Sequence, residues 1–441
     1  MSDSPASARP AVIWSLVEES FEEAEFLWNR WEDGLGSHTR DLTGTAFWVE
    51  ERLAGSLEGI RVGGDAAFEP LLAPAMASDE PWRLAVAAHV AATGDSQQAR
   101  DLLSVMIGTA SGPRLAAFRR AVELAPQTEQ IGVVGRNLAR GGLEQKAALL
   151  AMRAFRRQAP GPELGEVLAA KNPALRAAAL EAARYLGATQ GLALVERALG
   201  ESEWVARNAA VESGLVLGSL AAWARCLELV RTQAPGVGPL LIPVAQLGTD
   251  REHDLLLAAL ANDSLRRDAL FAAGFAGTVR AADACAEAMR SDEDAQVAAE
   301  SFCAITGLSL ERERLVEPEP PGPDEETLDA EMVPTQDEQL PRPKVADVLS
   351  WWTRHRGQFS TAARYARGQP LTMRELQNVL ETGPMGRRHA TALEMSIRTN
   401  GRYDVATRAF TATQRKQMRA FEAVMAAKAT PSPLSRSISP I

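Results

Sequence analysis

The chain of 441 residues contains few cysteines, tyrosines and histidines, and each shortage narrows what the protein can be. Three cysteines, none close to another, favour buried thiols in a reducing compartment over a disulfide framework. Three tyrosines in a chain rich in alanine and leucine favour helices over sheets. The five histidines are scattered and none pairs at metal-ligand spacing, so we expect neither a metal nor a cofactor.

Transmembrane and catalytic signatures are missing as well. No run approaches the roughly 18 uncharged residues of a membrane span, and the first residues lack a basic segment followed by an apolar one. The phosphate-binding glycine loop, the nucleophile elbow, the zinc-protease helix and the paired-cysteine motif are not found. We therefore expect a cytoplasmic protein that is not an enzyme and has no membrane partner.

Glycine, in contrast, recurs through the middle of the chain with the period of a helical repeat. The intervals are 29 to 31 residues, or three times 31 in one case, and a basic residue precedes four of these glycines by eleven positions. This period predicts stacked helical hairpins in which each glycine can take a left-handed conformation and end a helix. The glycines are Gly94, Gly187, Gly218, Gly248, Gly277 and Gly307, and the basic positions are Arg83, Arg114, Lys146, Arg176, Arg207 and Arg266.

One basic side chain per repeat would form a ladder along one side of the stack, which has two interpretations. The ladder could bond to acids or carbonyls of the adjacent repeat, or it could bind phosphate or carboxylate groups of a ligand. Residues 1–316 carry a net charge of −12, which argues against a nucleic-acid groove because phosphate binding needs a positive local potential.

Charge and proline content divide the chain further. Residues 317–340 carry nine acids and no basic residue, whereas residues 341–441 carry a net charge of +11. We expect an all-α fold with six segments: 1–10 disordered, 11–68 an N-terminal helical hairpin cap, 69–316 a helical-repeat solenoid, 317–343 an acidic proline-rich linker, 344–428 a basic helical C-terminal module and 429–441 a disordered tail.

Six arginines of the C-terminal module lie near aromatic residues and form a candidate interaction patch. Arginine beside aromatic rings can stack on nucleic-acid bases, but a solvated arginine face over an aromatic core is the favoured interpretation. Electrostatic docking of the module onto the acidic body or linker is a third. The six are Arg354, Arg356, Arg364, Arg367, Arg387 and Arg388.

Several segments resemble known repeat proteins. Leu175–Leu180 (LRAAAL) with Leu186-Gly187 resembles short bacterial HEAT repeats. Glu51–Gly64 (ERLAGSLEGIRVGG), and Trp351-Trp352 followed by Arg364–Leu371 (RYARGQPL), resemble a proteobacterial HEAT-repeat family of unknown function, whose genes often lie among type VI secretion components. The resemblance spans nearly the whole chain and implies a HEAT-like α-solenoid without assigned catalytic residues. Ser56 stands where the family usually has a histidine, which removes any role for that histidine here.

These patterns lead to a protein–protein interaction scaffold or adaptor as the expected function, and the resemblance implies an accessory role in type VI secretion with a secretion component or effector as partner. The alternatives are a HEAT-fold enzyme such as an alkyl-base DNA glycosylase, nucleic-acid binding through the C-terminal module, and a purely structural spacer. The acidic body makes nucleic acid the less favoured partner.

Overall fold

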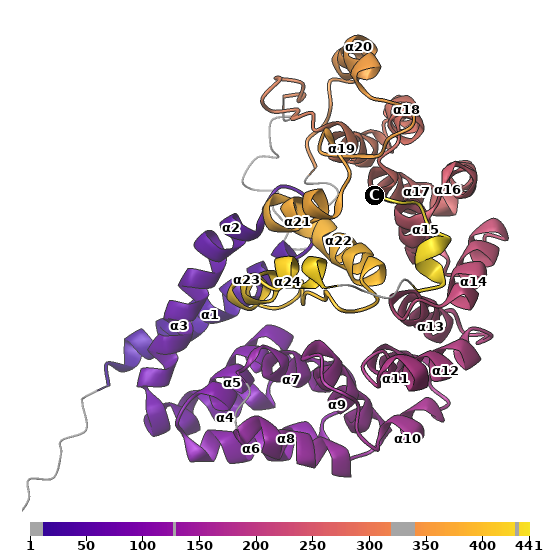
Figure 1. Cartoon of the computed structure of the whole chain (residues 1–441). Coiled ribbons are helices and arrows are strands. Elements are labelled where there is room, and N and C mark those ends of the chain that lie inside the picture. The colour runs from indigo at the N-terminus through magenta and orange to yellow at the C-terminus, as the bar shows by residue number, and fades with distance from the viewer. Residues whose placement is uncertain (1–11, 127–128, 319–339, 428–431) are drawn as a thin grey trace, which may run out of the picture. The chain divides into compact units, whose positions relative to one another are not determined.

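A computed structural model describes residues 12–126, 129–318, 340–427 and 432–441 (Figure 1). Within these ranges the fold is all-α, as predicted, with one short β-hairpin. The chain divides into two compact units: unit 1 comprises residues 1–34 and 44–182, and unit 2 comprises residues 35–43 and 183–441. The division falls inside the predicted repeat block. The predicted disordered segment 1–10 and most of the predicted linker lie outside the described residues.

Unit 1 begins with an antiparallel pair of helices, α1 (Trp14–Gly34) and α3 (Glu51–Val62). The chain reaches α3 through α2 (Leu42–Thr45) and a π-helical turn, η1 (Ala46–Glu50). One stripe of α1 is buried at three- and four-residue spacing, because a helix buries the face on which such residues align. Both α1 and α3 pack against α5 (Pro81–Thr93), the first long repeat helix. The stripe consists of Val17, Phe21, Ala24, Leu27, Trp28 and Trp31.

The rest of unit 1 is a stack of helices in two rows. Helices α5, α7 and α9 pack against one another in one row, and α6 and α8 form the other. The elements after α3 are η2 (Gly64–Ala67), η3 (Phe68–Leu72), α4 (Ala73–Ala77), α5, α6 (Gln97–Thr109), α7 (Gly112–Leu124), α8 (Glu129–Arg140), α9 (Leu143–Phe155), α10 (Leu164–Leu168) and α11 (Pro173–Ala183).

Unit 2 repeats this arrangement. Helices α15, α17 and α19 pack side by side, while α14 contacts α16 in the second row (Figure 1). The elements are α12 (Ala188–Ala198), α13 (Trp204–Val216), α14 (Leu220–Arg231), η4 (Gly238–Leu240), α15 (Leu241–Leu247), α16 (Asp250–Ala259), α17 (Asp263–Ala276), α18 (Val279–Ala288) and α19 (Ala295–Thr306).

Residues 340–427 pack on these helices of unit 2. Helix α22 contacts α13 and α15, α20 contacts α18, and strand β1 contacts α19. The short antiparallel hairpin pairs Tyr365 with Pro370 and Ala366 with Gln369. The elements are α20 (Val345–His355), η6 (Arg356–Gln358), β1 (Tyr365–Ala366), β2 (Gln369–Pro370), α21 (Met373–Thr382), α22 (Met385–Arg398), α23 (Thr411–Met418), α24 (Phe421–Ala426) and η7 (Leu434–Arg436).

The six repeat glycines all lie between helices, but only four have a positive φ. Gly187, Gly218, Gly277 and Gly307 have φ values of 68° to 92°. Gly94 and Gly248 directly follow α5 and α15 with φ of −88° and −69°. At these two positions the chain leaves the helix in an extended conformation, for which glycine's access to positive φ is not needed.

The C-terminal residues 432–441 follow a defined path in unit 2, although residues 429–441 are predicted to be disordered. Leu434 is buried, and the Ser439 N–H donates to the carbonyl of Leu247, at the end of α15, over 2.7 Å. A serine- and proline-rich composition indicates disorder only when the segment has no partner. Here a carbonyl at a helix end, which lacks an intrahelical donor, accepts a hydrogen bond from the extended segment.

Candidate functional site

The predicted basic ladder occupies the third or fourth residue of its row helices and bonds mainly to the ends of preceding segments. Carbonyls in the last turn of a helix lack intrahelical donors and carry partial negative charge, so a guanidinium is stabilising there. Arg114 donates to the carbonyls of Met76, Ala77 and Ser78, Arg176 to those of Ala170 and Lys171, and Arg266 to that of Leu260, over 2.7 to 3.1 Å. Arg207 differs, because its carbonyl partner, Pro235 at 2.8 Å, lies in the loop that follows α14.

The other two ladder positions form ion pairs. Arg83 contacts Glu25 on α1 at 3.3 Å, and Lys146 contacts Glu166 at 2.6 Å. The geometry therefore favours the structural interpretation of the ladder, because its charged groups bond to the protein itself.

The β1–β2 hairpin crosses the C-terminal ends of two adjacent row helices. The Tyr365 N–H donates to the carbonyl of Gly277 after α17, over 2.7 Å. The N–H groups of Arg367 and Gly368 donate to Ala304 and Ile305 in α19, over 2.7 and 2.9 Å. The hairpin thus satisfies carbonyls that the helices leave open.

Arg364, just before the hairpin, extends this contact to α15. Its guanidinium donates to the carbonyl of Gln246 in α15 (2.7 Å) and to the carbonyls of Phe275 and Ala276 in α17 (2.9 and 2.8 Å). The side chain is only 9% exposed. Burial lowers the pKa of Arg364 to about 10, although the nearby Glu394 carboxylate raises it. The side chain is charged at neutral pH and complements two helix ends at once.

A second buried contact joins α22 to α19. Arg387 forms a bidentate pair with Glu300 and also donates to the Ser301 hydroxyl at 3.0 Å. Its guanidinium lies over the rings of Phe271 and Phe275, at 4.7 and 4.6 Å from their centroids. Burial alone would raise the pKa of Glu300, but the charge and hydrogen bonds of Arg387 outweigh it and hold the pKa at about 2.

The six arginines of the predicted C-terminal patch do not form one surface. Arg364, Arg387 and Arg388 are largely buried, and Arg388 donates to Gln414 over 2.5 Å. The other three bond within unit 2: Arg354 to the Ser350 carbonyl, Arg356 bidentately to Asp283, and Arg367 to the Thr382 hydroxyl. The prediction treated sequence clustering as surface clustering, whereas docking places half of these side chains inside the unit.

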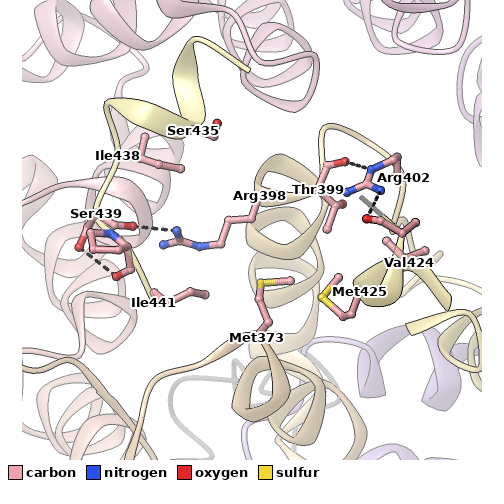
Figure 2. A pocket seen from close by; sticks show the side chains of 12 residues that line it. Met373, Arg398, Thr399, Arg402, Val424, Met425, Ser435, Ile438, Ser439 and Ile441 are labelled. Atoms are coloured by element: carbon pink, nitrogen blue, oxygen red, sulfur yellow. Dashed lines mark hydrogen bonds between the residues drawn. The ribbon is translucent and has the colours of Figure 1, made fainter. Parts of the chain in front are cut away.

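A pocket of about 390 Å³ lies between the end of α22, α24 and the C-terminal segment (Figure 2). Arg398 crosses from α22 to the segment and donates to the carbonyls of Ser439 and Gln246, each over 2.8 Å, while Glu394 pairs with it from one turn away. Arg402 donates to the carbonyl of Thr399 at 3.1 Å. Both guanidinium groups donate to protein oxygens, so the pocket resembles a gap in the packing more than a ligand site.

A second pocket of about 400 Å³ lies in unit 1 between α8 and α9. Arg136, Arg153 and Arg156 line it together with Glu163, which pairs with Arg153 at 2.9 Å. Arg156 donates to the carbonyl of Val122 over 2.7 Å, and burial lowers its pKa. The lining is positive, but two of its three cations already bond to the protein.

A buried histidine and two buried cysteines have pKa values shifted so that they stay uncharged. His89 Nδ1 lies 3.0 Å from the carbonyl oxygen of Ala121, and burial lowers its pKa to about 4. Burial raises the pKa of Cys226 and of Cys285 to about 12. These three groups are therefore neutral at pH 7, as expected for packing residues.

The described residues show neither a cluster of metal ligands nor a membrane-spanning helix. No group of three or more His, Cys, Asp and Glu side chains there could hold a metal ion. Among those same residues, every helix is too short or too polar to cross a bilayer.

No model of a known protein family matches this chain, and no curated protein matches its sequence. The resemblance to a HEAT-repeat family therefore stays a prediction. Its two segments have clear places in the structure: residues 51–64 form α3 and the start of η2, and residues 351–371 run from α20 through the docking hairpin.

Sequence reasoning missed the acidic partners of the C-terminal arginines and a group of exposed aromatic residues. Glu300 and Glu394 are separated from Arg387 and Arg364 by 87 and 30 positions, so no local spacing links them. The aromatic group left a signal: Phe26 lies off the apolar stripe of α1, and Phe47-Trp48 places two large rings side by side in a solvent-facing turn.

Proposed function

We propose that this chain is a non-enzymatic scaffold that binds another protein through its helical repeats. The observation that carries the proposal is the stacking of row helices whose ends are closed by the chain's own arginines. Such stacks present side chains on long, regular helical surfaces, which is how repeat proteins bind partners. The charged groups that a ligand-binding ladder would need are engaged in holding the helices together.

The resemblance of residues 51–64 and 351–371 supports a narrower form of this proposal. In that form the chain acts in the cytoplasm as an accessory protein of a type VI secretion system, and its partner is a secretion component or an effector. Deleting the gene in a strain with an active system should then reduce secretion of at least one effector. Normal secretion would overturn the narrower form and leave the scaffold proposal intact.

The scaffold proposal is tested by reconstitution. Cross-linking in the native cells names the partners, and each is then purified and mixed with the full chain. We expect one to form a complex of fixed stoichiometry by analytical ultracentrifugation, with cross-links concentrated on exposed helix faces of the repeats. If no purified candidate forms such a complex, the proposal is wrong.

The same purified chain tests the alternatives. Incubation with alkylated duplex DNA should release no base, and binding to single- or double-stranded DNA should not exceed that of an acidic carrier protein. Base release would replace the scaffold with a glycosylase. The burial of Arg364, Arg387 and Arg388 removes half of the predicted arginine patch from any phosphate-binding surface, because buried guanidinium groups cannot reach a DNA backbone.

A further inference from the structure

Three large aromatic side chains are exposed on the N-terminal helical pair of unit 1. Phe26 on α1 is 57% exposed, and Phe47 and Trp48 on η1 are 56% and 66% exposed. The rings of Phe47 and Trp48 meet edge to face, with centroids 4.8 Å apart. Rings of this size gain most from burial, and neighbouring exposed aromatics mark interaction surfaces more often than isolated ones do.

The local geometry places these side chains on the same side of the helical pair. Glu23 of α1 bonds to Arg52 of α3 at 2.5 Å, which marks the solvent-facing seam between the two helices. Phe26 lies three residues after Glu23 and Trp48 lies four residues before Arg52, and residues at these spacings share a helix face. Because α1 and α3 run antiparallel, going forward from Glu23 to Phe26 and going back from Arg52 to Trp48 lead to the same end of the seam.

The π-helical turn η1 explains why the rings stay outside. Glu50 accepts a hydrogen bond from the Trp31 indole over 2.8 Å, which ties the end of η1 to α1. Val49 points inward and is buried. Because Val49 is held inward and Glu50 is bonded to Trp31, Phe47 and Trp48 face solvent. The wider π-helical turn is also a common feature of functional sites.

The surroundings of the rings are acidic. Helix α1 carries seven acids and one basic residue, Arg30. Glu22 and Glu19 lie four and seven residues before Phe26, on its face of the helix, and both are exposed. Neither forms an ion pair with any residue that the structure describes. Arg30, also exposed, lies four residues after Phe26 on the same face, so Phe26 stands between this cation on one side and the unpaired Glu19 and Glu22 on the other.

We propose that Phe26, Phe47 and Trp48 form an aromatic docking face for a basic amphipathic helix or strand of a partner protein. The partner's apolar side chains cover the rings, and its Lys or Arg side chains meet Glu19 and Glu22. This inference rests on the proposed scaffold function and identifies one surface and its partner's chemistry. Negative charge here disfavours nucleic acid and anionic lipid, and a two-fold contact between copies would bring like charges together.

The test uses a defined probe with the full chain. The probe is a fluorescein-labelled helical peptide of about 18 residues, with leucine on one face and lysine on the other, and its matched control carries glutamate in place of lysine. By fluorescence anisotropy we expect the lysine peptide to bind at least about tenfold more tightly than the glutamate peptide, and less tightly as salt is raised.

Variants separate this face from general attraction to an acidic protein. Phe47→Ser with Trp48→Ser should weaken the lysine peptide about tenfold or more, and Glu19→Gln with Glu22→Gln should weaken it a few-fold and flatten the salt dependence. Trp204→Ser removes an exposed tryptophan of unit 2 and should leave affinity unchanged. The docking face is wrong if the aromatic double variant, shown to be folded by circular dichroism, binds as the unaltered chain does, or if Trp204→Ser weakens binding equally.

The scaffold proposal and this inference fail separately. A reconstituted partner that binds the Phe47→Ser, Trp48→Ser variant with undiminished affinity overturns the docking face and leaves the scaffold standing. The absence of any reconstituted partner overturns the scaffold whatever the peptide does.

Discussion

The C-terminal ends of the row helices are closed by different means in the two units. In unit 1 the closing groups come from nearby sequence: Arg100 donates to Gly94 at the end of α5, and Arg156 donates to Val122 in α7. In unit 2 the ends of α15, α17 and α19 receive Arg364 and the β1–β2 hairpin, from 60 to almost 120 positions away. One type of repeat thus supports either local or long-range closure.

This difference has an energetic consequence. Arg114 of unit 1 keeps 31% of its side chain exposed, whereas Arg364 of unit 2 keeps 9%. Water can replace a lost donor at an exposed helix end, but a buried carbonyl left without a donor costs its full desolvation penalty. Stability in unit 2 should therefore depend on the docked C-terminal residues far more than unit 1 depends on any single arginine.

The largest expected effect comes from the buried pair between α19 and α22. Arg387→Met leaves the Glu300 carboxylate buried without its guanidinium partner and with His38 nearby, at 3.7 Å, which should destabilise unit 2 by about 3–5 kcal/mol. Urea unfolding with hydrogen exchange resolved by unit would measure it. The double variant Arg387→Met, Glu300→Met should be less destabilised than the single variant, and an additive result would contradict the assigned coupling.

The two helix-end arginines test the comparison directly. Arg364→Ala should cost about 2–3 kcal/mol and speed hydrogen exchange at the ends of α15 and α17, because several buried carbonyls lose their donor together. Arg114→Ala should cost only about 1 kcal/mol, since water reaches the end of α4. If the two variants lose equal unfolding free energy and equal hydrogen-exchange protection, the difference in burial between the two arginines has no effect on stability.

One buried group in each unit should respond to acid in a different pH range. His89 of unit 1 has a pKa lowered to about 4, so the unfolded chain binds its proton first and stability falls as pH drops from about 6.5 to 4, by roughly 2–3 kcal/mol. Glu300 of unit 2 has a pKa lowered to about 2, so its contribution is kept until pH falls below about 4.5. Burial also lowers the pKa of His253 in unit 2, so the comparison is made in a His253→Gln background. There, hydrogen exchange at pH 7, 6 and 5 should show unit 1 weakening first, and His89→Gln should remove most of that difference.

Glycine substitutions give the smallest contrast. Gly277→Ala should destabilise unit 2 by about 1–2 kcal/mol, because its φ of 68° is left-handed and an added Cβ would overlap the Tyr365 carbonyl. Gly165 of unit 1 lies in α10 with open space around its Cα, so Gly165→Ala should stabilise by up to about 1 kcal/mol. Thermal unfolding measures both, and a harmless Gly277→Ala would mean that the hairpin does not press on this helix end.

Local patterns predicted the elements well and the contacts between distant segments poorly. The spacing from Arg266 to Gly277 located α17 because helix starts and stops depend on neighbouring residues. The same kind of reasoning placed Arg364 and Arg387 on an interaction surface, because a count of nearby arginines carries no information on burial. The path of residues 432–441 was missed for a related reason, since its hydrogen bonds go to Leu247 in α15.

The sequence by itself determined the all-α class, the period of the repeat and the positions of its basic and glycine residues, because these follow from backbone preferences over three or four turns of helix. Only the tertiary structure decided which helix ends stay open, which arginines close them, and which aromatic rings remain exposed. Those outcomes depend on desolvation and on pairing between groups as distant in sequence as Leu247 and Ser439, and no local pattern encodes them.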